Sequence, residues 1–140
     1  PEQRGGTANG TVIISDEKIS SPILSQYDTA ILLNQPSLDK FQPKVKVGGT
    51  IIYDSFGIIE KPKREDINNF CLDAMNTAAE MKLMKTFNMM VLGGFLKLHP
   101  IVSIESVMKA LKKSLPERHW DLLPMNEQAI LKGMEIIHKQ

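Results

Sequence analysis

The chain has 140 residues, of which 42% are hydrophobic and 24% charged, which is ordinary for one globular domain. Its net charge of +1 favours neither nucleic acid nor an anionic membrane, and no apolar run approaches the ~20 residues that cross a bilayer. The single cysteine excludes a disulfide framework and an iron–sulfur cluster held by this chain alone. We therefore expect one cytoplasmic domain over residues 1–140, without nucleic-acid or membrane partners.

The amino-terminal stretch is a polar, glycine-rich loop that runs into an apolar segment. Arg4, Gly5 and Gly6 precede residues 11–15 (Thr-Val-Ile-Ile-Ser), which predict a strand. A glycine-rich loop with one arginine can approach an anion or another chain closely, although plain turns share this composition. The abrupt start predicts a domain that is incomplete at its amino-terminal end.

Two short apolar runs, residues 29–33 and 50–53, predict strands that are buried on both faces, because neither run alternates with polar side chains. The gap between them is too long for a hairpin, so we expect a crossover and parallel pairing. Within that gap, Ser37 is the expected N-cap of a short helix over residues 38–41, and Gly48-Gly49 predict a turn. Gln35 is expected to be extended because it precedes a proline.

The second half of the chain predicts one more strand and four helices. Residues 68–72 predict the strand and residues 74–82 the helix that follows it. Residues 87–98 are apolar on nearly all sides, which predicts a helix buried in the core or against a partner. Ser103 and Asn126 are the expected N-caps of the last two helices. The sequence thus predicts an α/β fold with an open, mostly parallel sheet and helices on both faces.

The carboxyl ends of the expected strands carry several polar side chains. In an open parallel sheet, ligands bind in the crevice beyond these ends. Asn34 and Gln35 offer donors and acceptors without charge there, which suits a polar group or a neighbouring backbone, but both can equally cap turns and helix starts. The same edge is expected to hold Asp54, Ser55, Asp73 and Asn76.

The other candidate groups favour structural roles. The three histidines, at positions 99, 119 and 138, lack carboxylates at ligand spacing, so no metal site is predicted. Cys71 lies in an apolar run and is expected to be a buried structural thiol. Residues 61–64 (Lys-Pro-Lys-Arg) predict a solvated loop in preference to a phosphate site. We predict no catalytic residue in this chain.

Several short motifs follow one another in a distinctive order: Arg4-Gly5-Gly6, residues 19–22 (Ile-Ser-Ser-Pro), residues 34–41 (Asn-Gln-Pro-Ser-Leu-Asp-Lys-Phe), and residues 43–49, 88–94 and 123–129. In this order they resemble the gamma subunit of 2-oxoacid:ferredoxin oxidoreductases over nearly the whole chain. The Asn34-Gln35-Pro36-Ser37 run looks most like the branch that acts on 2-oxoglutarate or branched-chain 2-oxoacids. The family normally begins with a strand, a Gly-x-Gly-Gly-Gln-Gly loop and a helix, to which nothing in this sequence corresponds.

This resemblance implies a three-layer fold like domain III of pyruvate–ferredoxin oxidoreductase, and a role as one subunit of an enzyme of anaerobic metabolism. Thiamine diphosphate, Mg²⁺, iron–sulfur clusters and coenzyme A (CoA) belong to the holoenzyme and none to this chain. The implied partners are alpha and beta subunits, with delta and a homodimer left open, and ferredoxin through the complex. Arg4, Gly5 and Gly6, with Asn34 and Gln35, are the residues carried over as a loop near the shared site.

Two alternatives stay open. The small subunit of indolepyruvate:ferredoxin oxidoreductase shares Arg-Gly-Gly and Ser-Pro with this chain but usually differs after the second strand. The second alternative is not an enzyme subunit: the chain would be a stand-alone module, without catalysis, that binds a nucleotide or CoA or interacts with another protein.

Overall fold

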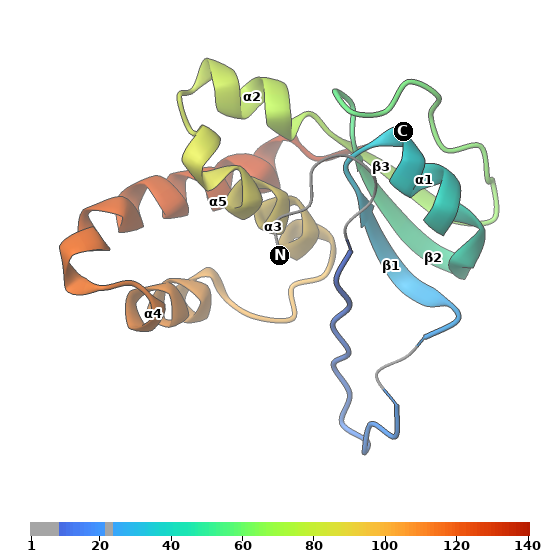
Figure 1. The fold of residues 1–140 in the computed structure, drawn as a ribbon, viewed down its shortest axis with the longest axis horizontal. Helices are drawn as coiled ribbons and strands as arrows, with labels where there is room; N and C mark the ends of the chain where they lie inside the picture. The colour runs from blue at the N-terminus through green and yellow to red at the C-terminus, as the bar shows by residue number, and fades with distance from the viewer. Residues whose placement is uncertain (1–8, 22–23) are drawn as a thin grey trace.

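A four-stranded sheet lies at the centre of the fold (Figure 1). The computed structural model describes residues 9–21 and 24–140. The strands lie in the order β1 (Tyr27–Leu32), β2 (Val45–Asp54), β3 (Asn68–Leu72) and β4 (His138–Lys139). β1 and β3 pair with β2 in parallel, and the short β4 pairs with β3 in antiparallel. The expected mostly parallel sheet is therefore confirmed.

Helices cover both faces of the sheet, as predicted. Helix α1 (Gln35–Phe41) lies on one face, and α2 (Ala74–Glu80), α3 (Phe87–Leu98) and α5 (Leu123–Ile136) lie on the other (Figure 1). Each face of the sheet has its own hydrophobic core. Successive β2 residues pack alternately into one core and the other, because side chains along a strand alternate between its faces. Ile51 and Tyr53 pack with α1, whereas Ile52 packs with α2 and α3.

Helix α3 lies between the sheet and α5, and its expected burial is confirmed. Met90 is fully buried, and Gly93 and Gly94 are buried as well. A β-carbon at Gly94 would stand 2.9 Å from the Leu72 side chain of β3. A β-carbon at Gly93 would stand 2.0 Å from the Ile130 carbonyl oxygen of α5. The glycine pair therefore lets α3 approach the sheet on one side and α5 on the other.

Strand β2 is longer than predicted, and the expected turn at Gly48-Gly49 is wrong. The strand begins at Val45 and runs through both glycines. Its register against β1 jumps from Tyr27↔Val45 to Thr29↔Thr50, so the extra β2 residues form a bulge. Gly48 adopts a φ of 80° there, a conformation that glycine tolerates without a steric penalty. The two glycines bend a continuous strand.

Two helix starts also differ from prediction. Helix α1 begins at Gln35, so the predictions of an extended Gln35 and of a Ser37 N-cap are wrong. Asn34 is the N-cap, and Pro36 falls in the first turn, where no backbone N–H is needed. Helix α5 begins at Leu123, so Asn126 lies inside it and donates from Nδ2 to the Leu122 carbonyl. Helix α4 (Ile104–Ser114) has the predicted Ser103 cap, with the Ser106 N–H donating to Ser103 Oγ at 3.0 Å. The described residues also form short 3₁₀ segments at η1 (Gln42–Lys44), η2 (Met84–Thr86) and η3 (Glu117–Leu122).

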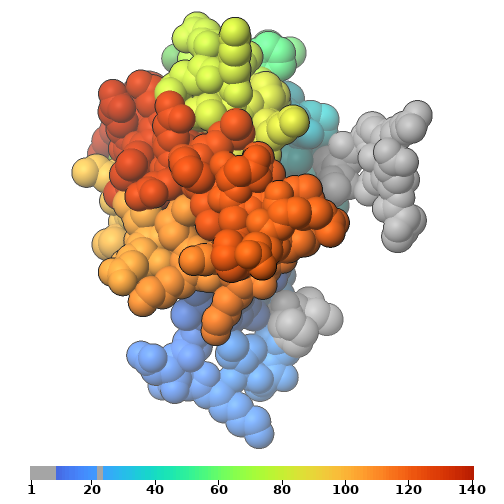
Figure 2. Space-filling view, turned by 90° about the vertical axis from the view of Figure 1, so that its left-hand side faces the viewer, coloured from blue at the N-terminus to red at the C-terminus, as the bar shows by residue number. Residues whose placement is uncertain are grey.

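The strand predicted for residues 11–15 is wrong. This segment has no strand pairing and projects from the body of the molecule, drawn in blue in Figures 1 and 2. Its β-branched side chains are largely exposed, with Val12 at 84% and Ile14 at 72%. High β-propensity alone does not form a strand without a neighbouring strand to pair with. Among the described residues, no helix is long and apolar enough to cross a membrane.

Candidate functional site

The carboxyl ends of the three parallel strands meet at one edge of the sheet, as predicted. The register pairs Leu32 of β1 with Tyr53 of β2, and Asp54 of β2 with Leu72 of β3. Asn34 follows β1 and Asp73 follows β3, so these two residues and Asp54 lie at the same edge. In this type of sheet, the edge is where a ligand or a neighbouring chain is expected.

Asp54 is the buried anchor of this edge, with only 2% of its surface exposed. Its Oδ1 accepts the Phe56 N–H at 2.9 Å, and its Oδ2 accepts the Met75 N–H at 3.0 Å, in the first turn of α2. Burial raises the pKa of the Asp54 carboxyl, and the two backbone N–H groups oppose that rise. Asp54 therefore joins the end of β2 to the start of α2 and leaves little of its carboxylate free for a ligand.

Asp73 gathers two polar neighbours at the surface of this edge. Its Oδ1 accepts the Ser55 hydroxyl at 2.7 Å and the Asn76 amide at 2.9 Å. Ser55 and Asn76 are exposed, and Asp73 is half-buried. This arrangement presents hydroxyl, amide and carboxylate groups together, which suits a polar backbone or a polar ligand group.

Asn34 and Gln35, the two site residues predicted within the described part of the chain, both make structural contacts. Asn34 Oδ1 accepts the Ser37 N–H at 2.9 Å and so caps α1. Gln35 Oε1 accepts the N–H groups of Ile59 and Glu60, both at 2.8 Å, and its amide donates to Asp39 and to the Glu60 carbonyl. Gln35 thereby holds the loop after β2, a contact across 24 residues of sequence that no local pattern indicates.

The interior beside this edge contains Tyr53 and Cys71. Burial raises the pKa of Tyr53 to about 12, with further contributions from the charge of Cys71 and a hydrogen bond to it. Burial also raises the pKa of the Cys71 thiol, so the reactive thiolate is disfavoured at neutral pH. Cys71 is half-buried, not fully buried as predicted, because it lies on the β3 side of the edge near Ser55 and Asp73.

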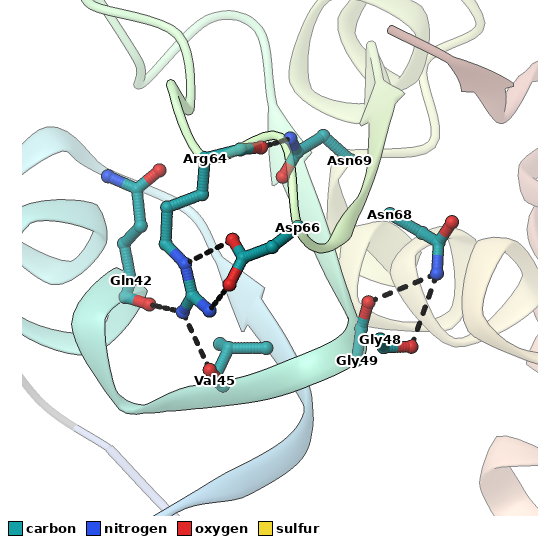
Figure 3. Close-up of polar contacts among 8 residues, drawn as sticks. All are labelled: Gln42, Val45, Gly48, Gly49, Arg64, Asp66, Asn68 and Asn69. Atoms are coloured by element: carbon teal, nitrogen blue, oxygen red, sulfur yellow. Dashed lines mark hydrogen bonds and ion pairs between the residues drawn. The ribbon is translucent and has the colours of Figure 1, made fainter.

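Lys61 and Lys63 are exposed, as expected for a solvated loop, but Arg64 in the same segment is a structural residue (Figure 3). Its guanidinium contacts both carboxylate oxygens of Asp66, from Nε at 2.8 Å and Nη2 at 2.6 Å. Nη1 donates to the carbonyls of Gln42 and Val45, at 2.9 and 2.6 Å. The Arg64 side chain thus ties the β2–β3 loop to the start of β2. A sequence pattern could have indicated only the Arg64–Asp66 pair, because the two carbonyls lie about twenty residues away.

The remaining predicted site residues, Arg4, Gly5 and Gly6, lie outside the described residues. Within residues 9–21 and 24–140, no group of three His, Cys, Asp or Glu side chains could hold a metal ion. The polar groups at the surface of the edge, Ser55, Asp73 and Asn76, are hydrogen-bonded to one another, and we derive no reaction step through Mg²⁺ or thiamine diphosphate. The edge offers a polar surface and a well-held loop, and no nucleophile–base pair is evident at it.

Comparison with known proteins gives this geometry a context. The model of the family "Pyruvate ferredoxin/flavodoxin oxidoreductase" matches residues 1–136. The chain is 33% identical over 138 residues to 2-oxoglutarate synthase subunit KorC of Methanocaldococcus jannaschii, covering 97% of this chain and 72% of that protein. It is 37% identical over 93 residues to ketoisovalerate oxidoreductase subunit VorA of Methanothermobacter marburgensis, which covers 66% of this chain and 19% of VorA.

A solved structure agrees with these relatives. The gamma subunit of a keto/oxoacid ferredoxin oxidoreductase from Geobacter sulfurreducens superposes with a TM-score of 0.70 at 25% identity. The match covers 87% of this chain and 66% of that subunit. These similarities confirm the resemblance to gamma subunits that the motifs indicate. The chain belongs to the pyruvate ferredoxin/flavodoxin oxidoreductase family.

Proposed function

We propose that this chain is the gamma-type subunit of a thiamine diphosphate-dependent 2-oxoacid:ferredoxin oxidoreductase. The complex would convert 2-oxoglutarate or a branched-chain 2-oxoacid, with CoA, into acyl-CoA, CO₂ and reduced ferredoxin. The observation that carries the proposal is the similarity to KorC over 97% of the chain. The similarity to VorA supports keeping a branched-chain 2-oxoacid as a second substrate class.

In this proposal the cofactors lie on companion subunits in the cytoplasm. Alpha and beta subunits, with or without delta, bind thiamine diphosphate, Mg²⁺ and the iron–sulfur clusters, and ferredoxin docks on the complex. The single cysteine supports this division, since a [4Fe–4S] cluster is held by four thiolates. Bound thiamine diphosphate supplies the decarboxylation chemistry, and this chain shapes the shared site.

Within this chain, the proposed shared-site residues act in different ways. The sequence Arg4-Gly5-Gly6 combines one cation with two glycines, a composition that suits contact with a substrate or cofactor phosphate. Asn34 and Gln35 use their side chains to cap α1 and to hold residues 59–60. Their contribution is therefore to position the edge of the sheet against the shared site.

The test is reconstitution with the partner subunits. The chain is purified alone and together with the alpha and beta subunits, and 2-oxoacid- and CoA-dependent reduction of a viologen dye is measured. 2-Oxoglutarate, 2-oxoisovalerate and indolepyruvate are compared as substrates. We expect no activity from the chain alone, activity with the partners, and a preference for one of the first two substrates.

Arg4→Ala tests the loop within the same complex. Losing one charge-assisted contact typically costs about 1.5–3 kcal/mol, so turnover or CoA binding should fall roughly ten- to hundred-fold. Stoichiometric iron in the isolated chain, or full activity of the partners without it, would overturn the subunit proposal. A clear preference for indolepyruvate would favour the alternative small-subunit assignment.

A further inference from the structure

The loop that follows β2 is held firmly by its backbone. The Phe56 N–H donates to buried Asp54 at 2.9 Å, and the N–H groups of Ile59 and Glu60 both donate to Gln35 Oε1 at 2.8 Å. Between them, Ile58 is 93% buried in the core beneath α1, being 7% exposed. Loops with satisfied N–H groups and a buried anchor open rarely, so this segment is a fixed part of the edge.

The same loop presents large apolar side chains to solvent. Phe56 is 65% exposed and Ile59 is 90% exposed. The Gly57 backbone lies against the end of β1, since a β-carbon there would stand 1.9 Å from the Leu33 carbonyl oxygen, and the Leu33 side chain is 41% exposed. A fixed backbone with outward Phe and Ile side chains costs little entropy on association, which is the property of an interface anchor.

We propose that Phe56 and Ile59 anchor this chain to the thiamine-binding part of its oxidoreductase. This inference rests on the proposed function and adds the surface of contact. The carboxyl edge of the sheet is the place where a parallel sheet meets a ligand or another chain, and this loop stands at that edge. The polar group of Ser55, Asp73 and Asn76 lies beside the loop and supplies a hydrogen-bonding rim.

The charges around the loop select the chemistry of the partner surface. Glu60 pairs with Lys63 at 3.6 Å, and Asp39 accepts a hydrogen bond from Gln35. The Glu60 charge is balanced, whereas Asp39 and Asp73 accept hydrogen bonds from neutral groups and keep their negative charge. The complementary surface is therefore an apolar protein pocket whose rim offers hydrogen-bond donors or cations. An acidic or phosphate-bearing partner would need unpaired cations at the centre of the contact.

The length of the relative VorA also favours a companion oxidoreductase segment as the partner that binds this loop. In VorA, which is 37% identical to this chain, the match covers only 19% of the polypeptide. A domain of this type is therefore joined in one chain to a much longer oxidoreductase segment in that relative. A second copy of this chain would not require such an attachment, whereas a lasting contact with a large companion segment agrees with it.

The test measures binding of the full chain to its purified alpha–beta subunits by biolayer interferometry. Phe56→Ser and Ile59→Ser are compared with wild type, and Val47→Ser is the matched control. Val47 is an apolar β2 side chain that is 78% exposed at the opposite end of the sheet. We expect Kd to rise about tenfold or more for each loop variant and to stay within about twofold for V47S.

The urea midpoint of each variant shows whether folding is affected, and we expect no change because the replaced side chains are exposed. Equal binding by wild type and both loop variants would overturn the docking surface while leaving the subunit proposal intact. Failure of the wild-type chain to bind alpha–beta would overturn both. The wild-type chain could instead form dimers that F56S and I59S dissociate. That result would overturn the proposed contact with the alpha–beta subunits and show that the loop binds a second copy of this chain.

Discussion

Gly93 of α3 lies so close to Ile130 of α5 that a β-carbon at Gly93 would stand 2.0 Å from the Ile130 carbonyl oxygen. The relationship is reciprocal, because a β-carbon at Gly133 of α5 would stand 1.9 Å from the Met90 carbonyl oxygen of α3. Two backbones thus meet where each helix has no side chain. This crossing holds α5 against the layer that covers the sheet.

Gly93→Ala and Gly133→Ala should each destabilise the fold. Alanine gains about 1 kcal/mol of helix propensity, but overpacking against a backbone carbonyl costs about 1–3 kcal/mol or more, and the backbone cannot yield as a flexible side chain would. We expect a lower urea midpoint for both variants at an unchanged m-value. Gly10→Ala is the control, since nothing lies within 4 Å of its β-carbon position. An unchanged midpoint in G93A would contradict the close crossing.

The apolar run of β2 correctly predicted burial on both faces, because Thr50–Tyr53 are all buried. The same prediction was wrong for β1, where Ile31 is 40% exposed, because one face of this edge strand is only partly covered. The runs at Asn68–Leu72 and Phe87–Leu98 gave bounds that the structure reproduces. The pattern failed where one residue type serves two purposes. Glycine pairs occur in turns and in bulges, so the register shift in β2 could not be read from Gly48 and Gly49.

The candidate site was predictable as a place but not as a set of contacts. Strand order alone brings Asn34, Asp54 and Asp73 to one edge. The contacts of Gln35 with Ile59 and of Arg64 with Val45 span 24 and 19 residues, and they exist only once the sheet has formed. The exposure of Phe56 could not be predicted from the sequence, because an apolar residue that follows a strand usually belongs to the hydrophobic core.

Asn34 offers a way to separate capping from any role at the shared site. Asn34→Ala should lower the free energy of unfolding by about 1 kcal/mol, because the Ser37 N–H loses its acceptor. Asn34→Asp keeps an oxygen at that position and should keep the stability. Thermal or urea unfolding measures both, and viologen reduction by the reconstituted complex measures function. Activity that falls in N34D at wild-type stability would assign Asn34 a part beyond the cap.

Because the pKa of the Tyr53 hydroxyl is raised in the folded protein, we predict that the free energy of unfolding falls at alkaline pH. The Tyr53 pKa of about 12 in the folded protein exceeds the ordinary value of 10.0, so the folded state favours the neutral phenol. This contribution is fully present below pH 10 and is lost as the pH rises through about 12. The urea midpoint of wild type should therefore fall over that range, and less steeply in Tyr53→Phe. Tyrosinate absorbance gives the titration directly, and a Tyr53 step near pH 10 would contradict the assignment.

Arg64 should control the order of the β2–β3 loop more than the stability of the whole fold. Arg64→Lys keeps the charge, but an ammonium group cannot reach both Asp66 oxygens and the carbonyls of Gln42 and Val45 together, as the planar guanidinium does. The loop then loses its tie to the start of β2. We expect faster amide exchange at Lys63, whose N–H donates to Gln42 Oε1, and earlier tryptic cleavage of the loop.

Lys61→Gln is the control, because Lys61 is exposed and its charge is not needed for these contacts. Exchange in R64K that matches wild type would mean that the Asp66 ion pair and the two carbonyl contacts do not hold the loop. Protection at α3 should stay the same in both variants, since that helix lies on the opposite face of the sheet.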